Sequence, residues 1–266
     1  MEGGIHVAIA PEIVGHWFGL PITNTLLMSW IVVFLLAAIA ITVGRKATLV
    51  PGKMQLLLEL GVSNVFDFVA DTLESRDHAK RYFPLIMTMF LFIFTANLLE
   101  FVPGVGSIGI LANQAHEAAE AAGHGAGYVP LLRSMNTDLN MTLALAIISF
   151  LVIEISGIVM IGFFKYMSRF LPFHAFHNGI GNGIIAMFVG LIEFVSELIR
   201  LISFSFRLFG NIFAGEVLIA VMAFFVPFAL PVPFMAFEVF VGFMQAAIFS
   251  LLTLFFIKLA ITETAH

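Results

Sequence analysis

The chain has 266 residues, of which 61% are hydrophobic and 11% are charged, and its formal net charge is −5 at pH 7. Soluble globular proteins carry about 25% charged residues, so the composition excludes an ordinary soluble domain. Because the sequence has no cysteine, disulfides, thiol catalysis and cysteine-ligated metals are also excluded. No shift in composition marks off a second unit, and we expect one membrane domain over residues 1–266.

The first predicted membrane-spanning helix covers residues 25–45, and Arg45 and Lys46 mark its end. Residues 1–20 contain no lysine or arginine, whereas a cleaved secretory signal has a basic start, so we expect this helix to be retained. After the turn at residues 50–53 (VPGK), residues 53–75 form an amphipathic pattern. Such a helix more often lies along the membrane surface than through it.

Two further spans are predicted at residues 82–102 and 138–165, with an outer loop at 103–137 between them. The stretch 183–226 is apolar and free of proline. As one helix it would be about 66 Å long, roughly twice the thickness of a hydrocarbon core. It is therefore either two spans joined by a tight hairpin or one strongly tilted helix. The last span, 233–262, follows a break that contains Pro227 and Pro231.

The basic residues favour the tilted helix. With the amino terminus outside, the predicted cytoplasmic segments contain Arg45, Lys46, Lys53, Arg76, Lys80, Arg81, Lys165 and Arg169. Only Arg133 falls in an outer loop, which is a strong positive-inside bias. Lys258 fits a cytoplasmic carboxyl terminus, and an even number of crossings must then follow Arg169. The predicted fold is an all-α polytopic membrane protein with five transmembrane helices and one interfacial amphipathic helix, the last two transmembrane helices being long and strongly tilted.

A polar face runs along the predicted long helix. Its members recur every three or four residues and fall within about 80° of one another: Glu193, Ser196, Arg200, Ser203, Arg207 and Asn211. Insertion scales put the cost of a charge at this depth at about 2.5–3.5 kcal/mol, and such residues usually mark an ion path. On the last helix, Glu238 and Gln245 are seven residues apart and share one face.

Structural roles compete with ion conduction at several of these positions. A serine in a membrane helix often serves a hydrogen bond between helices, and for Ser196 and Ser203 the two roles weigh about equally. Arg200 can pair with Glu193 or Glu197, which favours a structural role. Arg207 has no acid three or four residues away, so its partner must come from elsewhere.

Glu216 lies about 180° around the long helix from Arg207 and thus belongs to a different compartment. Glu216 and Glu238 stand on either side of the proline break, and we expect them to approach each other near the outer surface.

The run from Ser205 to Glu216 (SFRLFGNIFAGE) closely resembles the signature of subunit a of the F-type ATP synthases. Further blocks agree in the order typical of that family: residues 50–53 (VPGK), 97–103 (NLLEFVP), 137–142 (TDLNMT) and 244–249 (MQAAIF). Together they cover roughly residues 25–260. One departure concerns Glu238, a position that holds histidine in some relatives and an acid in others, so the Glu216–Glu238 pair here consists of two acids.

The resemblance implies a stator subunit in the bacterial inner membrane, with two offset half-channels that carry protons to and from a ring of c subunits. Arg207 would face the ring carboxylate and block leakage, electrostatically, because arginine does not release its proton. The outer half-channel would contain Asn211, Glu216, Glu238 and Gln245. The cytoplasmic half-channel would contain Glu193, Ser196 and Glu197, with Arg200, Ser203 and Asp138 in supporting roles.

The implied partners are the c-subunit ring, the peripheral stalk subunit b, the whole F1Fo complex and membrane lipid, with no nucleic acid. We expect no active site within this chain, no cofactor and no metal. Histidine and glutamate pairs at 116–117 and 120–124, and the histidines at 174 and 177, are better explained by a solvated loop and a polar interfacial turn than by metal binding. A secondary transporter, which would show internal repeats, and a non-conducting assembly factor are the rival functions. The coupling ion, H⁺ or Na⁺, stays open.

Overall fold

The computed structural model describes residues 11–17, 20–46, 48, 52–102, 105, 108–111, 128–170, 180–226 and 229–262. The helices in chain order are α1 (Asn24–Lys46), α2 (Lys53–Leu73), α3 (Arg76–Leu99), α5 (Leu139–Ile161), α6 (Phe163–Phe170), α7 (Ile180–Phe225) and α8 (Pro231–Thr262). Two antiparallel pairs of short strands join β1 (Ile13–Trp17) to β2 (Leu20–Thr23) and β4 (Gly109–Leu111) to β5 (Tyr128–Pro130). A 3₁₀ turn, η2, covers Met135–Thr137.

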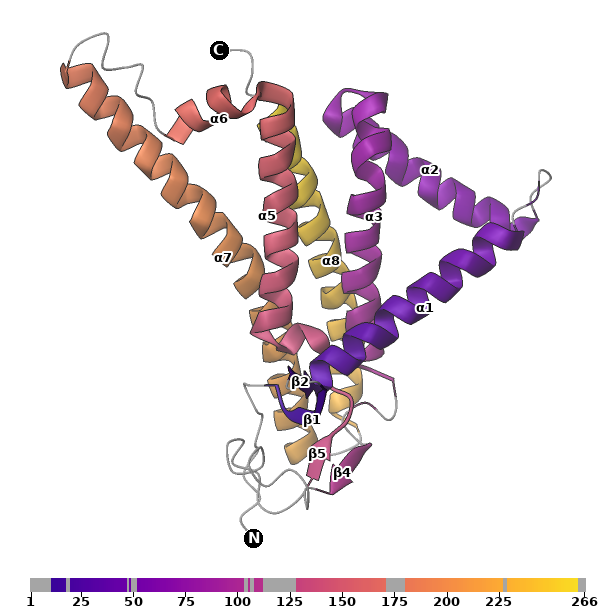
Figure 1. Ribbon diagram of the computed structural model, residues 1–266. Helices are drawn as coiled ribbons and strands as arrows, with labels where there is room; N and C mark the ends of the chain where they lie inside the picture. Colours follow the sequence, from indigo (N-terminus) through magenta and orange to yellow (C-terminus); the bar gives the residue numbers. More distant parts are fainter. Residues whose placement is uncertain are drawn as a thin grey trace.

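Among the described residues, five helices are long and apolar enough to cross a membrane: α1, α3, α5, α7 and α8. This confirms the predicted class, an all-α polytopic membrane protein with five spans. Helix α2 is not one of the five, and apolar side chains such as Leu57 are exposed on it. The sequence did not predict the two strand pairs, which lie together near one end of the bundle, called here the hairpin end (Figure 1).

The centre of the bundle is formed by α3, α5 and α8, which run side by side (Figure 1). Buried apolar side chains fill the space between these helices and the adjoining part of α7: Ile93, Ala146, Leu208, Ile212, Ala246 and Phe249. Two hydrogen bonds between hydroxyl groups add to this packing, since Ser149 meets Thr253 of α8 at 2.6 Å and Thr142 meets Ser205 of α7 at 3.1 Å. Such polar contacts are typical of helix association in membranes.

Helix α7 is continuous over 46 residues, which at 1.5 Å per residue is about 69 Å. It packs against α5 near the hairpin end and then diverges from it toward the opposite end (Figure 1). At that opposite end, called here the α6 end, α5 stops at Ile161 and α6 leads from there toward the α7 side (Figure 1). Gly162 makes the turn possible because its φ of 90° strains any residue that has a side chain.

Candidate functional site

The packing of α7 divides its surface into three strips. One strip is buried against the bundle and consists of Glu197, Phe204, Leu208, Ile212 and Gly215. Arg207 lies about 100° around the helix from the middle of this buried strip and is exposed. The outer apolar face lies beyond Arg207. The polar face that begins at Glu193 therefore follows the border between packed protein and open helix surface.

Arg207 stands on this border, and no described residue of opposite charge pairs with it. Within the residues that the structure describes, its guanidinium makes no hydrogen bond, ion pair or ring contact. One turn further along, Asn211 donates a hydrogen bond of 3.3 Å to the side-chain oxygen of Gln245 on α8. The structure thus brings together Asn211 and Gln245 and leaves Arg207 facing outward.

Acidic side chains gather at the hairpin end of the same two helices. Glu238 of α8 is buried against α7 at Gly215, where an added Cβ would lie 2.3 Å from the Glu238 carboxyl carbon. Only glycine leaves room for the carboxylate at this point. Glu216, the next residue of α7, forms an ion pair of 3.2 Å with Arg133. A cation from the segment before η2 thus lies beside Glu216.

A third carboxylate, Glu100, follows the end of α3. Burial, together with the negative charges of Glu216 and Glu238, raises the pKa of Glu100 to about 8, although a hydrogen bond with Ser134 and the positive charge of Arg133 oppose the rise. A cavity of about 170 Å³ opens between Glu100, Arg133 and Glu216. At roughly 30 Å³ per water molecule, it has room for several waters.

Arg133 and Glu100 are members of the site that were not predicted from the sequence. Each of the two residues has a feature in the sequence that could have indicated it. Arg133 was the one basic residue assigned to an outer loop, against the positive-inside bias. Glu100 is an acid at the end of a predicted span, inside the block at 97–103 that carried the family resemblance.

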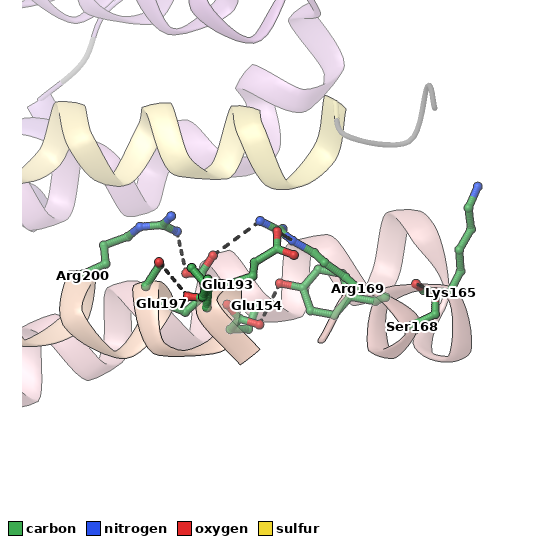
Figure 2. A network of polar contacts seen from close by, with 10 residues as sticks. Glu154, Lys165, Ser168, Arg169, Glu193, Glu197 and Arg200 are labelled. Atoms are coloured by element: carbon green, nitrogen blue, oxygen red, sulfur yellow. Dashed lines mark hydrogen bonds and ion pairs between the residues drawn. The ribbon is translucent and has the colours of Figure 1, made fainter. Parts of the chain in front are cut away.

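At the α6 end, the acids of α7 lie in a network of ion pairs (Figure 2). Arg169 of α6 pairs with Glu193, and its other arm lies 3.7 Å from Glu197. Arg200 also pairs with Glu197, at 2.5 Å, and stacks over the Phe256 ring at 3.9 Å. Arg200 therefore has one of the two partners that its spacing allowed.

The remaining predicted residues have simpler surroundings. Ser196 is exposed and bonds back to the Ile192 carbonyl at 2.8 Å, and Ser203 is exposed on the same face. Asp138 caps the start of α5 by accepting a hydrogen bond from the Asn140 backbone, and it also accepts one from Thr25, both at 2.9 Å. This is a structural role.

The described residues contain no group of three or more side chains suited to hold a metal ion. The histidines and glutamates that the sequence analysis considered for metal binding lie outside the described residues: His116, Glu117, Glu120, His124, His174 and His177.

Fold and site together define a polytopic membrane protein with ionisable side chains along its spanning helices, a class in which such side chains mark ion pathways. Comparison with known proteins identifies the family. The family described as ATP synthase A chain matches residues 26–258, and the chain belongs to this family.

Curated relatives agree with this assignment over nearly the whole chain. ATP synthase subunit a of Moorella thermoacetica is 27% identical over 249 residues, covering 94% of this chain and 95% of the relative. The subunit a of Campylobacter jejuni is 32% identical over 238 residues, 87% of this chain and 89% of the relative. The subunit a of a Psychrobacter species is 34% identical over 230 residues, 84% of this chain and 77% of the relative.

Proposed function

We propose that this chain is the stator subunit a of a rotary F-type ATP synthase, a non-catalytic part of the membrane Fo sector that guides protons to and from a turning c-ring. The observation that carries the proposal is the exposed Arg207, which has no partner among the described residues. A guanidinium within a membrane helix is costly unless a partner meets it. The ring carboxylate is a partner of the required charge.

In this proposal Arg207 acts by its charge. Arginine stays protonated in proteins, so it cannot pass a proton on. It attracts the ionised carboxylate of each ring subunit, promotes proton release, and separates two half-channels so that protons cannot cross without turning the ring. The available energy is about 2.3 kcal/mol per charge for each 100 mV of membrane potential.

The outer half-channel would run along the hairpin end. Water in the cavity beside Glu100 and Arg133 would deliver protons to Glu216 and Glu238, and the Asn211–Gln245 pair would lie between these acids and Arg207. Arg133 supplies a positive charge beside Glu216.

The cytoplasmic half-channel would lie at the α6 end, with Glu193, Ser196 and Glu197 on the polar side of α7. The amino terminus is then outside and the carboxyl terminus cytoplasmic, in agreement with the distribution of lysine and arginine. The peripheral stalk subunit b would hold the chain in place against the rotating ring.

Purification and reconstitution test the proposal. The tagged chain should purify with a c-ring, and liposomes that hold both should conduct protons down an imposed gradient. Liposomes that hold the chain alone should conduct no protons. Proton flux through the chain alone would identify a transporter, and unchanged flux through complexes that lack the chain would identify an assembly factor. Either result would overturn the proposal.

A further inference from the structure

Helix α6 is short, and one aromatic side chain fixes its position. Tyr166 is only 1% exposed, and its ring lies where an added Cβ on Gly157 would approach it to 2.4 Å. The hydroxyl of Tyr166 donates a hydrogen bond of 2.7 Å to Glu154 of α5. Burial and this hydrogen bond raise the pKa of Tyr166, so the phenol stays protonated and keeps donating. Glycine in α5 and tyrosine in α6 together seat the short helix against the bundle.

With α6 held in this position, Arg169 of α6 contacts two acids of α7. Its Nε meets the Glu193 carboxylate, and its Nη2 lies 3.7 Å from Glu197 (Figure 2). The three side chains are 19%, 30% and 5% exposed, so their charges are only weakly screened by solvent. The planar guanidinium offers several N–H groups in a fixed fork, which allows one arginine to hold two carboxylates at once.

We infer that Arg169 is a positioning residue for proton exit at the α6 end. Its contacts hold the diverging half of α7 to α6, and its charge lies beside both carboxylates, Glu193 and Glu197, at the point where protons would leave. The inference rests on the proposed function, since the two acids serve proton exit only in a proton-conducting chain.

Other charged or titratable groups face this cluster and remain when Arg169 is replaced. Arg200 still pairs with Glu197 from within α7, while Tyr166 of α6 holds Glu154 of α5. On the α8 side, the Phe256 ring covers Arg200. Removal of Arg169 therefore takes away the ion pair of Glu193, whereas Glu197 keeps its ion pair with Arg200.

The test uses assembled F1Fo complexes in proteoliposomes and measures ATP synthesis driven by a fixed proton gradient, over a range of pH on the F1 side. In Arg169→Gln, Glu193 and Glu197 lose the cation that lies beside them. Synthesis should fall by about tenfold at the acid end of the range, where proton release to the F1 side is hardest, and recover toward the parent rate at the alkaline end; the size is that expected for losing one hydrogen bond to a charged group. A loss caused only by weaker packing would be equal at every pH.

Two further variants complete the test. Lys165→Gln removes a positive charge from the exposed side of the same short helix and should leave the pH profile unchanged. Arg169→Lys keeps the charge but loses the fork, so it should give an intermediate profile, and it replaces Arg169→Gln if that variant does not assemble. A parental profile in Arg169→Gln, a pH-independent loss, or the same shift in Lys165→Gln would overturn the inference. All three outcomes are distinct from a failure of the proposed function, which would appear as coupled synthesis without Arg207.

Discussion

Replacing Gly215 with alanine tests the position of Glu238 by way of its neighbour. The new Cβ would lie 2.3 Å from the Glu238 carboxyl carbon, whereas ordinary contact begins near 3.4 Å, so the carboxylate must retreat by about 1 Å. Overpacking of this kind costs about 1–3 kcal/mol of stability. A displacement of 1 Å at a reacting group can cost about 100-fold in rate. We therefore expect ATP-driven proton pumping to fall by between about tenfold and 100-fold while the complex still assembles.

Proton pumping in inverted membrane vesicles, normalised to the amount of complex, measures the effect. Gly181→Ala is the matched control, because it makes the same change in the same helix at a position with nothing within 4 Å. Shortening the acid in the double variant Gly215→Ala with Glu238→Asp should restore part of the activity by making room for the new methyl group. Pumping at the parent rate in Gly215→Ala would refute a conducting role for the Glu238 carboxylate in its observed position.

Two further predictions concern the residues that neighbour these acids. Arg133→Gln should lower proton pumping by about tenfold or more, since a hydrogen bond to a charged group contributes about 1.5–3 kcal/mol. Arg133→Lys keeps the charge and should retain part of the activity. Equal pumping in the parent and both variants would exclude the Arg133–Glu216 pair from the proton path. The pKa of Glu100 is about 8 in the folded protein against a usual value of 4.5, so the folded state holds a proton that the unfolded state has lost, and stability should fall as pH rises between these values. Thermal dissociation of the solubilised complex, followed across that pH window, should depend less on pH in Glu100→Gln, and an unaltered pH dependence would contradict the burial of this carboxyl group.

Much of the membrane architecture could be predicted from the sequence because its physical basis is local. Apolar runs and their lengths set the five spans, and the distribution of basic residues favoured one helix for the long segment, which the structure shows as α7. The family resemblance assigned Asn211 and Gln245 to the same half-channel, and they form a hydrogen bond in the structure.

Contacts between distant segments could not be predicted in the same way. Arg133 and Glu216 are 83 residues apart in the chain, and no helical period connects a loop residue to a helix face. Arg169 was noted only as a cytoplasmic charge, since its reach to Glu193 depends on the turn at Gly162 that starts α6. The strand pairs were missed because β1, β2, β4 and β5 are three to five residues long, too short to show a clear alternation.

The central claim is that Arg207 supplies the charge that couples proton flow to the ring. Proton-driven ATP synthesis by purified complexes with Arg207→Ala tests it most directly, with Arg45→Ala at the exposed end of α1 as the control. The account predicts that Arg207→Ala abolishes synthesis at an imposed gradient while Arg45→Ala matches the parent. Coupled ATP synthesis at the parent rate in Arg207→Ala would contradict it.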